Sequence, residues 1–458
     1  MAIATVNPVN GHVEKEFTEI DSVELERALA LAQSTFEGLR TSTISQRSTW
    51  LHAAADILEQ DVKSLAKIMV IEMGKPIAQA EGEVLKCAKG LRFYADNAED
   101  FLKDEWLEDS SAVGAAQAGT RYFPLGVVLA VMPWNYPLWQ AIRFAAPTLA
   151  AGNVGLLKHA SNVPQTALYL GELFTRAGFP EGAFQTLLIG AGAVQAVIED
   201  PRVKAVTLTG SEPAGRSVAA IAGQEIKKTV LELGGSDPFI VLPSADIEKA
   251  VEAAFKTRTI NNGQSCVCGK RFIIHADVYD QFTELFVAKM AAAKIGDPLD
   301  PTTEVGPLAT KSGRDEIASL VNDAVSKGAT LLTGGVVPEE EGWWYPPTVL
   351  ADLPEDALLI QEEAFGPVAS LYCVASVDEA LKIANQTRFG LSSNVWSTDT
   401  AEQEYCINGL DAGAVFVNGF TASYNELPFG GVKASGYGRE LALVGMREFL
   451  NAKTVWKA

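Results

Sequence analysis

The sequence predicts an α/β protein built from two domains, each with its own parallel sheet. Short apolar runs that end in Gly, Asn or Pro alternate with stretches of helical periodicity, and this pattern is typical of parallel sheets covered on both faces. One series lies between residues 102 and 235, and a second begins near Phe239. The length of 458 residues also exceeds that of one ordinary core. We therefore expect a domain boundary near Gly234–Pro238.

The first hundred residues are predicted to be mainly helical. Apolar residues recur at helical spacing over 22–40, and Asp21 or Ser22 can cap the start of this helix. The pattern continues over 48–73, where a Gly and a Pro end it, and a third helix is expected from about 77 to 102.

Further candidate elements follow from the same patterns. In the first series the expected strands are 127–135, 152–159, 183–192, 203–211 and 229–238, with helices at 165–177, 193–200 and 213–222. In the second series the expected strands are 239–244, 271–276, 329–335, 368–376 and 412–419, with helices at 247–256, 278–293 and 311–327. Residues 110–124 and 452–458 fit neither series, and we expect exposed strands that add to a neighbour's sheet edge.

Composition and charge exclude several classes of protein. Acidic residues outnumber basic ones 57 to 37, and the resulting net charge of -20 repels nucleic acid and anionic lipid. The most apolar stretch, 125–139, is interrupted by Pro133, Asn135 and Pro137 and is too short for a membrane span. The start of the chain lacks the pattern of a signal peptide, and five cysteines do not form a disulfide framework. We expect a reduced, soluble, cytoplasmic protein.

Two glycine-containing turns are candidates for phosphate binding. Residues 190–195, GAGAVQ, approach the dinucleotide fingerprint but lack its third Gly. Residues 210–215, GSEPAG, follow an apolar strand and open a helix, where backbone N–H groups favour a phosphate. A plain turn remains the alternative at both places.

Cys266 and Glu232 are the candidates for catalysis. Cys266 ends the polar segment 261–266, NNGQSC, where a helix entry would stabilise a thiolate, although a single Cys is usually a small buried residue. None of the four histidines has a motif around it, so a Cys–His pair is poorly supported, and Cys268 lacks the second ligand pair of a metal site. Glu232 follows an apolar strand, where burial would raise its pKa and make it a base; a surface Glu is the alternative.

Five motifs of the chain resemble the aldehyde dehydrogenase superfamily. They are Pro133–Pro137 (PWNYP), Glu232–Gly235 (ELGG), Gly263–Cys266 (GQSC), Glu362–Pro367 (EEAFGP) and Pro428–Lys433 (PFGGVK). All five occur in the order and at the spacing of that family, and the resemblance covers essentially the whole chain.

The resemblance implies a domain organisation and an assembly. A cofactor-binding domain would comprise 1–109 and 126–235, and a catalytic domain would comprise 236–436. Residues 110–125 and 437–458 would form a small β extension for oligomerisation, in a homodimer or a dimer of dimers.

The resemblance also implies a mechanism. Cys266 would attack the aldehyde, with Asn135 and the Cys266 backbone N–H stabilising the oxyanion. After hydride transfer, Glu232 would activate the water that hydrolyses the thioester, so hydrolysis is expected rather than transfer to coenzyme A.

Cofactor positions carry over from the family in the same way. Lys158 and Ser161 match the adenine-side ribose, and Glu363 matches the acid that holds the nicotinamide ribose. NAD-preferring members have Glu where this chain has Ser161, and a carboxylate would repel a 2′-phosphate. NADP is therefore the expected cofactor, with NAD as a weaker alternative. The other matching positions are Trp134, Gly210, Ser211, Leu233 and Phe365.

Around the substrate the chain resembles bacterial, NADP-preferring succinate-semialdehyde dehydrogenases. Arg143 would bind the distal carboxylate of the substrate in bidentate fashion, Ser423 would assist, and Trp139 would wall the pocket. A structural ion pair is the alternative for Arg143, and Ile260 stands where many members have a second Arg. A broader ω-oxo-acid or medium-chain aldehyde dehydrogenase is the alternative enzyme. The intact Cys266, Glu232 and Asn135 disfavour a binding or structural protein on this fold.

Cys268 is the remaining candidate. Some succinate-semialdehyde dehydrogenases carry a Cys two residues after the nucleophile and use it in a redox switch. A Cys266–Cys268 disulfide would close a very small, strained and easily reduced ring. A packing residue beneath the loop is the alternative.

Overall fold

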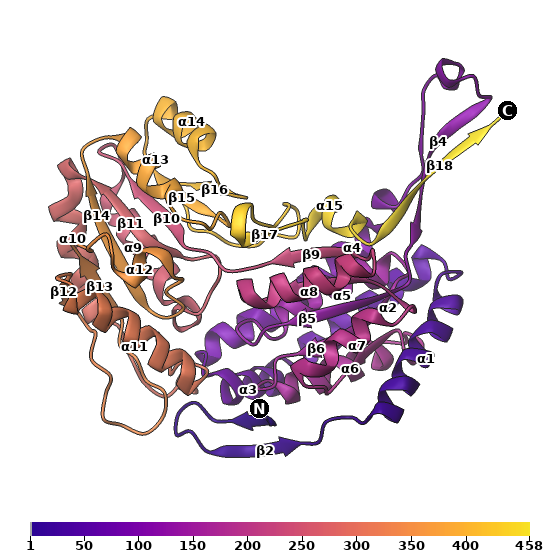
Figure 1. The fold of residues 1–458 in the computed structure, drawn as a ribbon, viewed down its shortest axis with the longest axis horizontal. Helices are drawn as coiled ribbons and strands as arrows, with labels where there is room; N and C mark the ends of the chain where they lie inside the picture. Colours follow the sequence, from indigo (N-terminus) through magenta and orange to yellow (C-terminus); the bar gives the residue numbers. More distant parts are fainter. Residues whose placement is uncertain (1) are drawn as a thin grey trace.

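Two mostly parallel sheets lie side by side in the computed structural model, which describes residues 2–458 (Figure 1). This arrangement confirms the predicted α/β class. The first sheet has the order β17-β9-β8-β5-β6-β7, and only β17 runs antiparallel to its neighbour. Its strands are β5 (Val127–Met132), β6 (Val154–His159), β7 (Phe184–Thr186), β8 (Val203–Thr209), β9 (Lys228–Glu232) and β17 (Gly436–Tyr437).

The second sheet has the order β12-β13-β14-β11-β10-β15-β16, and only β12 is antiparallel. Its strands are β10 (Asp237–Val241), β11 (Gly269–His275), β12 (Thr330–Thr333), β13 (Thr348–Ala351), β14 (Val368–Val374), β15 (Ser393–Trp396) and β16 (Val415–Val417). The sequence patterns missed β13 and β15. In β15 the first two residues are polar, and they are fully buried because hydrogen bonds satisfy them, as between Ser393 Oγ and the carbonyl of Ala414.

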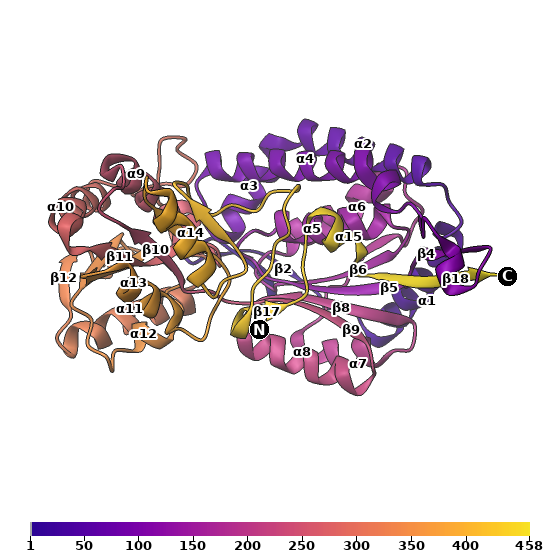
Figure 2. The same cartoon turned by 90° about the horizontal axis from the view of Figure 1, so that it is seen from above.

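Helices cover both faces of the first sheet. Figure 2 shows α2, α3 and α4 above it and α7 and α8 below it. Asp21 begins α1 through a capping box with Glu24, as the sequence predicts. The helices are α1 (Ser22–Leu39), α2 (Ile44–Gln60), α3 (Val62–Met73), α4 (Ile77–Phe101), α5 (Trp139–Ala150), α6 (Pro164–Arg176), α7 (Val194–Glu199) and α8 (Glu212–Gln224).

The helical stretch predicted over 48–73 is two helices, because the chain leaves helical geometry at Asp61. The Asp61 carboxylate accepts hydrogen bonds from Tyr169 and Arg176 on α6, each at 2.8 Å. This contact with a distant helix holds the break, which local periodicity cannot reveal.

The second sheet is covered by six helices, of which the sequence predicted three. The predicted ones are α9 (Ile247–Thr259), α10 (Ala276–Ala291) and α11 (Lys311–Ser326). The shorter ones are α12 (Leu358–Gln361), α13 (Val377–Asn385) and α14 (Thr400–Gly409). A further hairpin, β1 (Ile3–Val6) with β2 (Val13–Phe17), lies near the start of the chain.

A ribbon of three strands projects from the body, with the C-terminus near its tip (Figure 1). In it β4 (Gln117–Pro124) pairs with β18 (Leu450–Lys457) over its whole length and with β3 (Glu105–Trp106) on its other side. The two segments predicted to be exposed strands therefore pair with each other, and β18 is the long strand left at an edge. Their role in oligomerisation stays a prediction.

The chain returns to the first domain earlier than residue 436. Phe429 already packs in the core of the first domain, and Leu441, Met446 and Phe449 join it there. These apolar side chains, together with α15 (Ala442–Arg447), place much of 428–449 in the first domain rather than in the catalytic or oligomerisation segments expected. Within residues 2–458 no helix combines the length and the apolar character that crossing a membrane requires.

Candidate active site between the two domains

Cys266 lies on a strained segment between α9 and β11. Asn261, Asn262 and Gly263 all have positive φ, at 56°, 58° and 74°. Asn tolerates this region better than most residues, and a Cβ at Gly263 would overlap the backbone of Gly366. Strain of this kind persists only where the surroundings hold it, and it is concentrated at functional sites.

Buried polar side chains hold this segment in place. The Asn261 amide donates to the backbone carbonyls of Asn135 at 2.7 Å and Gln264 at 2.9 Å. The fully buried Arg258 donates to the carbonyl of Gly263 at 2.6 Å. The position of Cys266 is therefore fixed by side chains from its own segment and by the loop after β5.

Asn135 and Cys266 each supply an N–H donor at this segment. Asn135 Oδ1 accepts from Gln140 Nε2 at 3.0 Å, and Asn135 Nδ2 donates one N–H to the carbonyl of Gln264 at 3.2 Å, which leaves its second N–H free in the part of the chain described. Within residues 2–458 no acceptor takes the backbone N–H of Cys266. This pair of donors is suited to a developing oxyanion.

The environment of Cys266 favours the protonated thiol over the thiolate. Burial raises the pKa of Cys266 to about 12, while the positive charges of Arg143 and Lys270 oppose that rise. The sulfur therefore needs a proton acceptor before it can act as a nucleophile.

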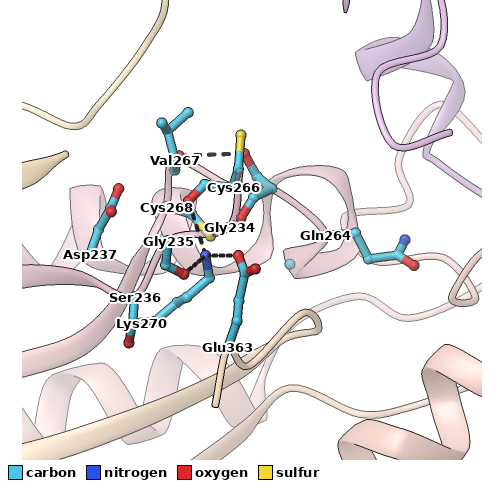
Figure 3. Close-up of polar contacts among 12 residues, drawn as sticks. Gly234, Gly235, Ser236, Asp237, Gln264, Cys266, Val267, Cys268, Lys270 and Glu363 are labelled. Atoms are coloured by element: carbon cyan, nitrogen blue, oxygen red, sulfur yellow. Dashed lines mark hydrogen bonds and ion pairs between the residues drawn. The ribbon is translucent and has the colours of Figure 1, made fainter. Parts of the chain in front are cut away.

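Lys270 was missed by the sequence reasoning, and it joins three parts of the site (Figure 3). Its Nζ donates to the carbonyl of Gly235 at 2.6 Å, to the carbonyl of Cys266 at 3.0 Å and to Glu363 Oε1 at 2.7 Å. The only sequence signal was a lysine inside the apolar strand β11. Since Glu363 belongs to a different motif from Cys266, this lysine sets the distance between the two motifs.

Cys268 is fully buried, and its thiol donates to the carbonyl of Ser265 at 3.0 Å. Figure 3 shows the sulfur atoms of Cys266 and Cys268 on opposite sides of the segment. A disulfide between them would require the segment to turn over. The arrangement supports a packing residue, and a redox role stays a prediction.

Glu232 ends β9 and is 2% exposed. In the described residues 2–458, neither carboxylate oxygen has a hydrogen-bond partner. Burial raises its pKa well above the ordinary value; Glu440 adds to the rise, while Arg143 and Arg439 oppose it. The negative charge of Glu232 contributes to the raised pKa of Cys266. A buried carboxyl with free oxygens and a raised pKa is, once ionised, a stronger base than an ordinary carboxylate.

Two cavities meet at Cys266 and Gln140. The larger has a volume of about 630 Å³ and lies between the domains. Within it the ring of Trp134, from the first domain, meets the ring of Phe365, from the second, edge to face at 5.7 Å between centroids. Six of the predicted cofactor residues line this cavity: Trp134, Gly210, Ser211, Leu233, Glu363 and Phe365.

The other two predicted cofactor residues, Lys158 and Ser161, lie outside this lining. Lys158 is the penultimate residue of strand β6, and Ser161 is in the loop that follows. They share the carboxyl edge of the parallel sheet with Trp134 and Gly210, the edge at which such sheets bind ligands. Burial lowers the pKa of Lys158, while Glu19 opposes that shift.

The smaller cavity has a volume of about 280 Å³. It contains Trp139, Arg143 and Ser423, the three predicted substrate residues, and also Lys86 from α4, which the sequence reasoning missed. Cys266 thus lies where the larger cavity between the domains meets a smaller, mainly apolar one that contains cationic groups.

Comparison with known proteins agrees with this geometry. The profile of the aldehyde dehydrogenase family matches residues 1–455. The chain belongs to the aldehyde dehydrogenase family. It is 61% identical over 457 residues to a Mycobacterium avium protein named succinate-semialdehyde dehydrogenase (NADP(+)), covering 100% of this chain and 97% of that one.

Two further relatives cover the whole chain. A Mycobacterium tuberculosis protein named succinate-semialdehyde dehydrogenase (NADP(+)) 1 is 59% identical over 458 residues, with 100% of each chain covered. The crystal structure of a Streptococcus pyogenes succinic semialdehyde dehydrogenase in complex with NADP+ matches with a TM-score of 0.96 at 37% identity, covering 99% of each chain.

In this aldehyde dehydrogenase Arg143 already has a partner within the protein. Its Nε forms a buried ion pair with Glu440, and its Nη2 donates to Thr209 at 3.4 Å. Its guanidinium also lies 4.5 Å from the centre of the Phe429 ring. The pairing supports the structural alternative and argues against Arg143 as the ligand of a substrate carboxylate, a role that stays a prediction.

Replacing Arg143 tests this interpretation. Arg143→Met leaves the buried Glu440 without a counter-charge, so we expect a loss of about 3–5 kcal/mol in the free energy of unfolding. Catalytic efficiency should fall equally for an aldehyde with a carboxylate and for butanal. The double variant Arg143→Met/Glu440→Gln should recover part of the stability in denaturant unfolding. A loss confined to the charged aldehyde, at unchanged stability, would contradict the structural role.

Proposed function

We propose that this chain oxidises succinate semialdehyde to succinate with NADP as the hydride acceptor. The observation that carries the proposal is the position of Cys266 at the junction of two cavities, one lined by Trp134, Glu363 and other residues at cofactor positions and one lined by cationic residues. The names of the relatives with about 60% identity point to the same substrate and cofactor.

The first step begins with transfer of the Cys266 thiol proton to solvent water, after which the thiolate attacks the aldehyde carbon. The carbonyl oxygen becomes an oxyanion, which Asn135 Nδ2 and the Cys266 backbone N–H stabilise. Each donor of this kind is worth about 3–4 kcal/mol in the barrier. When bound, NADP accepts the hydride, and a thioester on Cys266 remains.

The second step is hydrolysis of this thioester. Glu232 takes a proton from a water molecule, the water oxygen adds to the acyl carbon, and the Cys266 thiolate leaves as the acid is released. The free oxygens of Glu232 and its raised pKa support this role. The presence of this base favours water over coenzyme A as the acceptor.

The residues at the cofactor cavity fit NADP. The aromatic rings of Trp134 and Phe365 line the cavity and can contact a ring of the cofactor. Gly210 and Ser211 lead into the 13-residue helix α8, whose first backbone N–H groups favour a phosphate. Glu363, positioned by its ion pair with Lys270, can accept from ribose hydroxyls. Lys158 and Ser161 can donate to a 2′-phosphate at the adenine end.

We also infer an assembly and a location for the enzyme. The long strand β18 at the edge of the projecting ribbon can pair with a second copy, so a homodimer or a dimer of dimers is the expected assembly. All five cysteines are free, which suits the reducing cytoplasm.

Cys266→Ala tests the assignment of the nucleophile. Without the sulfur no thioester can form, so NADPH formation from any aldehyde should be lost while NADP still binds. The measurement is absorbance of NADPH with a panel that includes succinate semialdehyde, longer ω-oxo-acids and butanal. Cys373→Ala, at an exposed cysteine on β14, is the matched control and should be fully active. Substantial turnover by Cys266→Ala would refute the mechanism, and a panel without preference for succinate semialdehyde would favour the broader alternative.

Glu232→Gln should stall the second step. An amide cannot take the proton of water, so a burst of NADPH followed by slow turnover is expected in stopped-flow traces. Because ionisation of Glu232 requires a pH above its raised pKa, the wild-type rate of thioester hydrolysis should rise with pH and the variant should lose that rise. Unchanged turnover with no burst would remove Glu232 from the mechanism.

Ser161→Glu should shift cofactor preference toward NAD. A carboxylate at this position repels a 2′-phosphate and accepts from a free ribose hydroxyl. The measurement is the ratio of kcat/KM for NADP to that for NAD, with Ser161→Ala as the control that removes the hydroxyl without adding charge. If the ratio is the same in Ser161→Glu and wild type, Ser161 is not at the adenine ribose.

A further inference from the structure

We propose that Lys86 and Ser423, rather than Arg143, bind the distal carboxylate of the substrate and make the enzyme selective for acidic aldehydes. This inference rests on the function proposed above and identifies a residue, Lys86, to which no role has been given. Lys86 lies in α4 and lines the same cavity as Cys266.

Lys86, Ser423 and Trp139 form a cluster of directed donors. Lys86 Nζ donates to Ser423 Oγ at 2.6 Å, and Trp139 Nε1 donates to the same oxygen at 3.0 Å. Lys86 Nζ also lies 4.3 Å from the centre of the Trp139 ring. The aromatic ring thereby holds the ammonium in place while leaving its charge available.

Once the hydrogen bonds within this cluster are formed, the hydrogen-bonding groups that remain unused are all donors. A hydroxyl has two acceptor lone pairs and one proton, and both lone pairs of Ser423 are taken by Lys86 and Trp139. Within residues 2–458 the Ser423 proton has no acceptor, and the ammonium of Lys86 retains two further N–H donors. A group that only accepts hydrogen bonds and carries negative charge, such as a carboxylate, satisfies all of them.

The charges lining the cavity lead to the same ligand. Lys75 is paired with Glu83, and Arg143 is paired with Glu440. Lys86 is the third positively charged residue that lines the cavity, and no carboxylate within residues 2–458 forms an ion pair with it. The cavity therefore carries one positive charge that a substrate can neutralise.

Burial makes this unpaired charge costly in the empty site. It lowers the pKa of Lys86 to about 8; Arg143 lowers it further, whereas Cys87, Glu83 and Cys266 oppose the shift. A bound carboxylate removes this penalty, so part of the binding free energy is gained only by substrates that carry one.

The test compares Lys86→Met with wild type on succinate semialdehyde and on butanal. Met keeps the apolar part of the side chain over Trp139 and removes the charge. We therefore expect kcat/KM for succinate semialdehyde to fall about 30-fold or more, and kcat/KM for butanal to change less than about threefold. Lys86→Arg should retain most of the preference. Lys89→Met, which removes an exposed lysine one turn away at 4.0 Å from Glu426, is the matched control and should behave as wild type.

A second measurement does not depend on the identity of the substrate. Succinate carries the carboxylate in question, whereas butanoate lacks a second one, so succinate should inhibit butanal oxidation by wild type more strongly than butanoate does. Lys86→Met should abolish this difference. Retained butanal turnover and NADP binding show that the variant is folded.

The outcomes separate the two proposals. Equal losses for both aldehydes in Lys86→Met, or no loss with succinate semialdehyde, would overturn the role of Lys86, as would unchanged inhibition by succinate. A wild-type enzyme that oxidises butanal but not succinate semialdehyde would instead overturn the proposed function. In that case the inhibition by succinate still decides whether Lys86 binds a carboxylate.

Discussion

The position of the Cys266 sulfur depends on one buried ammonium group. All three N–H donors of Lys270 are used: one on the linker at Gly235, one on the backbone of Cys266 and one on Glu363 (Figure 3). The linker belongs to neither sheet, and the other two groups come from separate motifs of the second domain. A buried ammonium whose three N–H groups all donate tolerates little displacement, because any movement leaves part of its charge without a hydrogen-bond partner and away from water. Cys266 and Glu363 therefore keep a fixed separation.

Among the buried charges around the smaller cavity, some are matched in ion pairs and others are not, and this difference separates architecture from chemistry. Lys75 with Glu83 and Arg143 with Glu440 are matched pairs, and they fix helices and the returning C-terminal segment. Glu232 and Lys86 lack such partners in the described chain. An unmatched buried charge is destabilising by itself, so its presence beside a cavity indicates a ligand or a proton that completes it.

The sequence was sufficient for the fold class, most strands and the catalytic candidates, because these depend on local pattern. Apolar runs mark strands wherever they occur, and short motifs surround Cys266 and Glu232. The sequence was insufficient where a partner lies far away along the chain. Lys86 and Ser423 are 337 positions apart, and the carboxylate that occupies Arg143 comes from the C-terminal segment. The break at Asp61 and the polar strand β15 were missed for the same reason.

The return of the chain to the first domain has a mechanical consequence. The polypeptide crosses between the domains once after β9 and again before Phe429, which packs in the first core. Two covalent crossings tie the domains together at two points, so sliding or rotating one domain against the other strains both connections at once. The placement of Trp134 opposite Phe365, one from each domain, is thereby held more firmly than a single linker would hold it.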